Sequence, residues 1–293
     1  MPSSYLYLNG LRLHYLHWNV ETGQQPIVAL HGLASNARIW ELVAPFLAEH
    51  GFQLYALDQR GHGLTDKPEG EYSFDVFRGD LLAFLDACQL DRPVLLGHSW
   101  GALVALDFAA HCAVGPRAPA GVVLVDGGVT QLDDGPDASW ERVRQRLTPP
   151  RLAGMPLDDF LKRLTDRGGP LGEDEHAVQA ILANFEIGAD ETLAPRLSFE
   201  HHMQIVRAMW EFKTFEYLQR LRCPVEAVLA EPPPGRSQLE EEFLSRKREG
   251  AARAREIQPR LRVHWLEETL HDIPLHRPGE LANLILEFTR GIS

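Results

Sequence analysis

The chain has 293 residues, of which 44% are hydrophobic, and it carries a formal net charge of −12 at neutral pH. The hydrophobic content is enough for one large core, so the composition is that of a globular protein with one or two domains. The acidic balance argues against a nucleic-acid or anionic-membrane surface, because such surfaces need clustered lysine and arginine, and we expect a small-molecule partner.

The N-terminal segment, residues 1–20, alternates apolar and polar residues and lacks the charged start and apolar run of a signal peptide, so it predicts strands. No apolar run approaches the ~18 residues that a membrane span requires, and we expect a cytoplasmic protein. Cys88, Cys112 and Cys223 are too few and too scattered for a disulfide framework or a tetrahedral zinc site, and we expect buried thiols. The sequence carries no signal for the oligomeric state.

Short apolar runs bounded by turn residues recur along the chain. They lie at residues 26–32, 52–59, 92–99, 121–128, 223–230 and 262–268. Their near-continuous valine, leucine and isoleucine content is typical of parallel strands covered by helices on both faces. Helical spacing of apolar residues appears between them, at 74–89, 102–112 and 278–289. The alternation predicts an α/β fold with a doubly wound, mostly parallel sheet.

Residues 129–222 interrupt this rhythm with amphipathic, charge-dotted segments and no convincing buried strand. We interpret them as an inserted helical cap over the carboxyl edge of the sheet, with residues 1–128 and 223–293 forming the core. A further charged helix, at 237–258, mixes both signs in the way that is typical of a solvated face, and the sequence assigns it no functional role.

A candidate nucleophile stands where the predicted strand at 92–99 meets the next helix, in the sequence Gly97-His98-Ser99-Trp100-Gly101. Small residues two positions before and two after Ser99 allow a sharp strand-to-helix turn, which lifts the serine hydroxyl clear of the backbone. The flanking strand and helix favour a nucleophile elbow over an ordinary glycine turn.

With three further motifs, the chain resembles the α/β-hydrolase fold, in its serine-nucleophile branch of carboxylesterase-like and lactonase-like enzymes. His31-Gly32-Leu33 resembles the oxyanion loop of that family, and residues 58–65, DQRGHGLT, resemble its D-x-R-G-H-G-x-S loop. His271, followed by Arg277-Pro278, resembles its histidine loop. The resemblance covers essentially all of the chain outside the insertion, and it implies acyl transfer without a metal or cofactor.

Acyl transfer at a serine needs a base and preorganised donors. A neutral hydroxyl is a poor nucleophile, so a histidine must accept its proton, and the oxyanion that forms needs hydrogen-bond donors already aimed at it. We expect the backbone N–H groups of Leu33 and Trp100 to be these donors. The side chain of Trp100 is also a candidate for lining the substrate pocket.

Among thirteen histidines, His271 is the expected base, because it follows the last strand at the edge of the sheet where catalytic residues collect. His276, five residues later, is the alternative. His31 and His62 are expected to be scaffold residues, and His98, the variable residue of the elbow, is expected at most to touch substrate. Glu200, His201 and His202 do not predict a metal site, since adjacent helical residues point in different directions.

The sequence offers two candidates for the acid of the triad. In most serine members of the family it follows the strand that here occupies 223–230, but this chain has Pro232-Pro233-Pro234 there. Asp126, at the end of the preceding strand, is the preferred acid, as in branches such as the haloalkane dehalogenases. Glu231 is the second candidate. Because Ser99 replaces the aspartate nucleophile of those branches, dehalogenation and epoxide hydrolysis are disfavoured.

The leading hypothesis is hydrolysis of carboxylic esters, with lactones as a further class, of small to medium acyl groups through an acyl-enzyme on Ser99. C–C bond hydrolysis, proline iminopeptidase-like amide cleavage and perhydrolysis remain open, because the motifs do not separate them. A ligand receptor without turnover, built on a hydrolase scaffold, remains the alternative of a different class.

Overall fold

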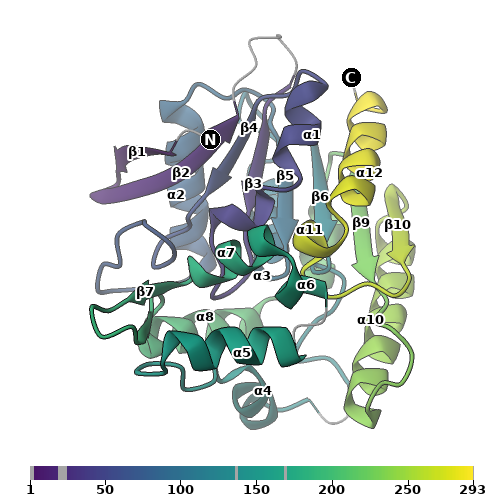
Figure 1. Ribbon diagram of the computed structural model, residues 1–293. Helices are drawn as coiled ribbons and strands as arrows, with labels where there is room; N and C mark the ends of the chain where they lie inside the picture. Colours follow the sequence, from purple (N-terminus) through teal and green to yellow (C-terminus); the bar gives the residue numbers. More distant parts are fainter. Residues whose placement is uncertain (1–2, 19–24, 136–137, 168–169, 293) are drawn as a thin grey trace.

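The computed structural model describes residues 3–18, 25–135, 138–167 and 170–292. Its centre is an eight-stranded sheet of order β1-β2-β4-β3-β5-β6-β9-β10 (Figure 1). The strands are β1 (Ser3–Leu8), β2 (Leu11–Trp18), β3 (Ile27–Leu30), β4 (Leu54–Leu57), β5 (Val94–His98), β6 (Gly121–Val125), β9 (Val225–Ala230) and β10 (Leu261–Leu266). Strand β2 runs antiparallel to both of its neighbours, β1 and β4, and the strands from β4 to β10 in this order pair in parallel. The predicted fold class is confirmed.

Helices cover both faces of this sheet. The core helices are η1 (Ala37–Trp40), α1 (Ala44–Glu49), α2 (Phe74–Ala87), α3 (Trp100–His111), α10 (Gln238–Ile257), α11 (Ile273–His276) and α12 (Pro278–Arg290). One apolar cluster joins the sheet to α2, α3 and α10, and a second joins it to η1, α1, α11 and α12. Because both faces are covered, β3, β5 and β6 are buried along their whole length, which explains their unbroken apolar sequence.

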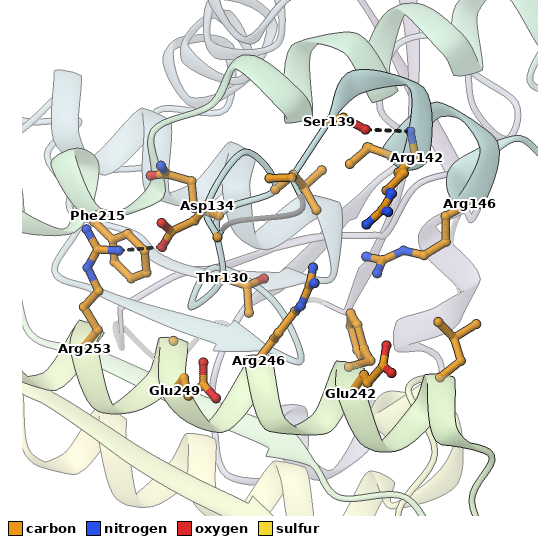
Figure 2. A pocket seen from close by; sticks show the side chains of 18 of the residues that line it. Thr130, Asp134, Ser139, Arg142, Arg146, Phe215, Glu242, Arg246, Glu249 and Arg253 are labelled. Atoms are coloured by element: carbon orange, nitrogen blue, oxygen red, sulfur yellow. Dashed lines mark hydrogen bonds and ion pairs between the residues drawn. The ribbon is translucent and has the colours of Figure 1, made fainter.

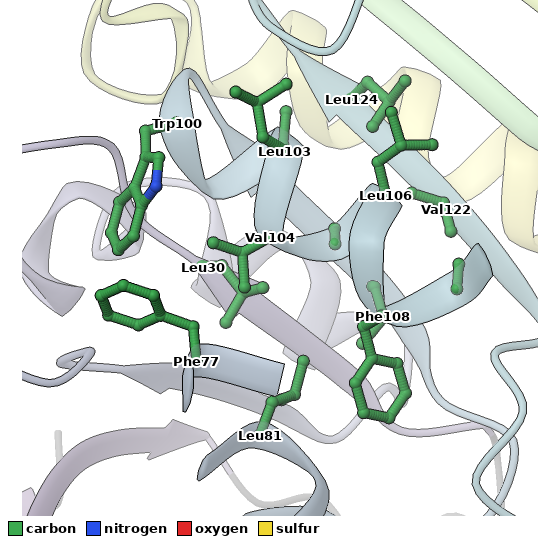
Figure 3. Packing of buried hydrophobic residues seen from close by; sticks show 14 of the residues in the cluster. Leu30, Phe77, Leu81, Trp100, Leu103, Val104, Leu106, Phe108, Val122 and Leu124 are labelled. Carbon is green, nitrogen blue, oxygen red and sulfur yellow. The ribbon is translucent and has the colours of Figure 1, made fainter. Parts of the chain in front are cut away.

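Helix α3 is the centre of the first cluster. Its side chains from Trp100 to Ala109 are all buried, and Figure 3 shows Trp100 facing Phe77 of α2, with Leu103 and Phe108 further along the helix. The two aromatic rings meet edge to face with their centroids 4.7 Å apart. This packing fixes the helix whose first residue follows the candidate nucleophile.

The segment between β6 and β9 contains α4 (Trp140–Leu147), α5 (Leu157–Arg167), α6 (Pro170–Glu173), α7 (Glu175–Leu182), α8 (Phe199–Glu211) and α9 (Thr214–Arg220). It also contains a short hairpin of β7 (Phe185–Ile187) and β8 (Leu193–Pro195), which the sequence did not predict because each strand has three residues. In Figure 1, α4, α5 and α8 lie beyond the carboxyl ends of β5 and β6. These three helices of the insertion thus lie over the edge where the candidate residues were expected.

The prediction of buried thiols is wrong, since Cys88, Cys112 and Cys223 are free but only partly buried. Cys88 and Cys112 cap the C-terminal ends of α2 and α3, where each helix reaches the surface. None of the helices in the described ranges combines the length and the apolar character needed to cross a membrane.

Candidate active site

The turn between β5 and α3 places Ser99 in an unusual backbone conformation, with φ 53° and ψ −117°. Two glycines make the turn possible. A Cβ on Gly97 would lie 2.4 Å from the carbonyl oxygen of Gly101, and a Cβ on Gly101 would lie 2.5 Å from that of His31. Any larger residue at either position would force the strand and helix apart, so the sequence of the elbow dictates its geometry.

Three side chains that the sequence singled out form a continuous hydrogen-bonded chain. Ser99 Oγ lies 3.0 Å from His271 Nε2, and His271 Nδ1 lies 2.6 Å from Asp126 Oδ2. They come from the ends of β5 and β6 and from the loop after β10, all at the carboxyl edge of the sheet. These distances are within reach for proton transfer between serine and histidine and for orientation of the imidazole by the carboxylate.

Asp126 is buried and holds a positive φ of 44°, a conformation that aspartate tolerates better than most residues. Besides His271, its carboxylate accepts hydrogen bonds at Oδ1 from the Ala230 N–H, at 2.9 Å, and from Lys247 Nζ, at 2.7 Å. Desolvation alone would raise the pKa of Asp126, but His271 and Lys247 outweigh it and lower that pKa to about 2. The carboxylate is therefore ionised throughout the neutral range.

Lys247 was missed by the sequence interpretation, which treated the helix at 237–258 as a solvated face. In the structure its side chain is buried, and its ammonium also donates to the carbonyl of Ala230 at 2.9 Å. The signal was its spacing: Lys247 occupies the same buried stripe of α10 as Leu244, Ala251 and Ala254. A charge in an apolar stripe requires a partner, and here the partner is Asp126.

The side chain of His271 has 52% of its surface accessible. Desolvation lowers the pKa of this imidazole, but the hydrogen bond and charge of Asp126 outweigh desolvation, so its pKa lies above the ordinary 6.5. The charge of Asp272 acts in the same direction, and that of Lys247 acts against it.

We expect the pH profile of kcat/KM to have an acid limb that reflects the raised pKa of His271. As a base His271 must be neutral, so kcat/KM for an uncharged ester should fall about tenfold per pH unit below the raised pKa, with a midpoint above 6.5. Initial rates at low substrate concentration between about pH 5 and 9 measure this limb. A midpoint below 6.5 would contradict the coupling to Asp126.

The loop after β3 lies against Ser99, the candidate nucleophile. A Cβ on Gly32 would be 3.2 Å from Ser99 Cβ, Leu33 is the next residue of that loop, and Trp100 is the first residue of α3. Both positions suit backbone donors to an oxyanion. The Trp100 side chain, however, is 1% exposed and belongs to the core, so it is not the pocket wall that the sequence suggested.

His98 is not placed to touch substrate as expected, because its ring is buried beneath the histidine loop. Its Nε2 is 3.0 Å from the carbonyl oxygen of His271 and donates to it. Burial, with the nearby His271, lowers the pKa of His98 to about 4, which keeps it neutral. It therefore helps to fix the backbone that carries the base.

The alternative candidates lie elsewhere. The carboxylate of Glu231 pairs with Arg248, at 2.7 Å, and with Arg236, at 3.6 Å, rather than with the imidazole of His271. His276 Nδ1 accepts from the N–H of Leu270, within its own loop. The hydrogen bonds thus favour Asp126 and His271 over Glu231 and His276.

The remaining histidines of the motifs make local contacts. His31 is buried, and its two ring nitrogens bond the carbonyl of Gly32, at 2.7 Å, and the N–H of Gln59, at 3.0 Å. His62 stacks on Trp100 with ring centroids 5.3 Å apart. These are the contacts of scaffold residues.

The adjacent residues His201 and His202 of the insertion lie in two different environments. His201 stacks on Tyr72 at 4.1 Å, and His202 Nε2 donates to the carbonyl of Leu147 at 2.9 Å. Among the described residues, no cluster of three histidine, cysteine or acidic side chains could hold a metal ion.

A cavity of about 800 Å³ lies between α4, residues 130–135 and one face of α10, beside this site (Figure 2). Arg246 rises into it from α10 toward Arg142 and Arg146, which extend from α4. None of Ser99, Asp126 or His271 lines this cavity. Arg246 therefore faces away from the triad, although the next residue, Lys247, contacts it.

Comparisons with known proteins agree with this architecture. A family model described as alpha/beta hydrolase fold matches residues 25–174. The chain is 32% identical over 273 residues to N-formylmaleamate deformylase of Pseudomonas putida, covering 91% of this chain and 88% of the relative. It is 34% identical over 186 residues to bifunctional epoxide hydrolase 2 of Sus scrofa, but that match spans only 30% of the relative. The structure of an enol-lactonase from Burkholderia xenovorans superposes with a TM-score of 0.70 at 19% identity, over 97% of this chain and 99% of that one, which shows the fold alone.

Proposed function

Because the chain belongs to the α/β-hydrolase fold family, we propose that it is a serine hydrolase that cleaves carboxylic esters, including lactones, through an acyl-enzyme on Ser99. The observation that carries this proposal is the hydrogen-bonded chain from Ser99 through His271 to Asp126, at 3.0 and 2.6 Å. A serine in the elbow, in place of an aspartate, favours acyl transfer over the chemistry named for the epoxide hydrolase relative.

The reaction follows from this geometry in two halves. Ser99 Oγ attacks the carbonyl carbon while His271 Nε2 takes the hydroxyl proton, and the N–H groups of Leu33 and Trp100 bind the oxyanion. The imidazolium then returns that proton to the departing alkoxide, which leaves as an alcohol. Water, deprotonated by the same imidazole, attacks the acyl-enzyme and releases the acid, and Ser99 recovers its proton.

Asp126 remains an anion through both halves. It holds the proton of the neutral imidazole on Nδ1, so that Nε2 faces Ser99 as an acceptor, and it stabilises the imidazolium when that forms. Its burial makes this stabilisation stronger than it would be in water.

A second candidate is hydrolysis of an N-formyl amide. The similarity to N-formylmaleamate deformylase over 91% of this chain favours it. The same residues serve this reaction, except that His271 must deliver its proton to an amine leaving group instead of an alkoxide. Initial rates on p-nitrophenyl esters, lactones, N-formyl amides and prolyl amides rank the substrate classes, and a preference for amides would replace the ester assignment.

We expect a fluorophosphonate to label the protein once, on Ser99, because the reagent mimics the tetrahedral intermediate and needs an activated serine. Intact mass and peptide mapping measure the label, and Ser99→Ala is the matched control. No labelling, together with no turnover of any substrate class, would refute the proposal in favour of a ligand receptor.

A further inference from the structure

The two oxygens of the Asp126 carboxylate have different partners. Oδ2 faces His271, whereas Oδ1 receives both the Ala230 N–H and the ammonium of Lys247. Lys247 also donates to the carbonyl of Ala230, so it ties the carboxylate to the end of β9. With Oδ1 held at two points, the carboxylate cannot rotate, and Oδ2 stays directed at His271.

A hydrogen bond alone did not require a lysine here, because the Ala230 N–H already donates to Oδ1. Burying an ammonium costs free energy unless its charge is matched, and the 7% exposed side chain of Lys247 is matched by Asp126, itself 2% exposed. Lys247 adds a positive charge that is separated from the His271 imidazole by the carboxylate of Asp126. Within the triad, that charge lowers the pKa of both Asp126 and His271.

Among the described residues, four titratable groups act on the His271 imidazole or pack against it. Asp126 and Asp272 favour its protonated form, Lys247 opposes it, and the neutral ring of His98 lies with its centroid 4.8 Å away. Of these groups, Lys247 is the cation, and within the triad it contacts Asp126 rather than Ser99 or His271. Its charge therefore offsets part of the attraction that the two carboxylates exert on a proton at His271.

We propose that Lys247 is a positioning residue of the triad, which fixes the Asp126 carboxylate and keeps His271 in its neutral, proton-accepting form to lower pH. This inference rests on the proposed function. It assigns to α10 a part in the reaction and implies that the enzyme works further into the acid range than the Ser99, His271 and Asp126 geometry alone would allow.

The test compares two variants that remove the same charge from neighbouring positions of one helix. Lys247→Met removes the cation at Asp126, and Arg246→Met removes a cation that points into the cavity between α4 and α10 (Figure 2). In Lys247→Met, the midpoint of the acid limb of kcat/KM should rise by about half to one pH unit. At a pH below the midpoint, the ratio of kcat/KM in Lys247→Met to that in the wild type should be about 3- to 10-fold lower than the same ratio at pH 8. The Arg246→Met limb should remain at the wild-type position.

Two further variants separate charge from packing. Lys247→Arg keeps the charge and should keep the limb at the wild-type midpoint, even where the larger side chain lowers kcat. Lys247→Gln keeps a hydrogen-bond donor but no charge, and its limb should rise as in Lys247→Met, so it replaces that variant if the methionine protein does not fold.

An acid limb that stays in place in the folded methionine or glutamine variant would overturn the inference and leave Lys247 a structural role only. An equal shift in Arg246→Met would overturn it too, because the effect would then belong to the overall charge of the protein. Wild-type labelling by a fluorophosphonate is recorded alongside. A protein that is labelled but shows no shift refutes the role of Lys247 alone, whereas a wild type that is neither labelled nor active on any substrate class refutes the proposed function.

Discussion

Replacing Ser99 with alanine or glycine should lower kcat by about 10⁶-fold, because neither residue offers a nucleophile and the intact His271 and Asp126 cannot act without one. The two variants should differ in stability, since position 99 has a φ of 53°. Glycine adopts that conformation freely and alanine does not, so Ser99→Gly should unfold with a free energy about 1 kcal/mol above that of Ser99→Ala.

Urea denaturation at equilibrium gives both free energies, and single-turnover rates with a p-nitrophenyl ester give the loss of activity. Equal stability of the two variants would mean that the elbow relaxes once the serine side chain is gone. Residual turnover near the wild-type rate would instead place the nucleophile elsewhere.

Asp126→Asn should lower kcat by about 10⁴-fold, while Glu231→Gln should leave it near the wild-type value. An asparagine at 126 must face donors from Lys247, Ala230 and His271 with one amide group that has a single acceptor oxygen. Its NH₂ would therefore turn toward a neighbour, and the imidazole tautomer that accepts the serine proton would be lost.

Glu231 is a matched control because it stands one residue beyond β9, near the position where the acid of most relatives in this fold was expected. Its carboxylate serves two arginines, and amidation removes only those partly exposed ion pairs. Steady-state kinetics on one ester at pH 8 compare the variants. If Glu231→Gln were the crippled enzyme, the acid would have to be reassigned and the role of Lys247 with it.

Much of the fold could be predicted from local patterns. The apolar runs at 92–99 and 121–128 became β5 and β6 because strands buried on both faces need no polar alternation. The proline at 278 marked the start of α12, as its fixed φ suits the first turn of a helix. The family model and the relatives confirm the fold that the motifs suggested.

The residues of the candidate site that directly follow predicted strands could be predicted from the sequence. The residues whose roles depend on tertiary contacts could not. Asp126 was preferred over Glu231 because its strand leads out beneath the predicted cap, and the structure places Asp126 Oδ2 at 2.6 Å from His271 Nδ1. The roles of His98 and Lys247 were not predictable in the same way. Each depends on a tertiary contact that no sequence motif marks: His98 donates to the backbone carbonyl of His271, and Lys247 donates to the carboxylate of Asp126.

The long sequence separations in this site bear on its biosynthesis. Ser99 meets His271 across 172 residues, and Asp126 meets His271 across 145. A chain emerging from the ribosome therefore carries the proposed nucleophile long before it carries the proposed base, and contacts of this range form late in folding. With the proposed function, the nascent protein should be inactive until β9, α10 and β10 have docked, so partly synthesised chains should not hydrolyse esters.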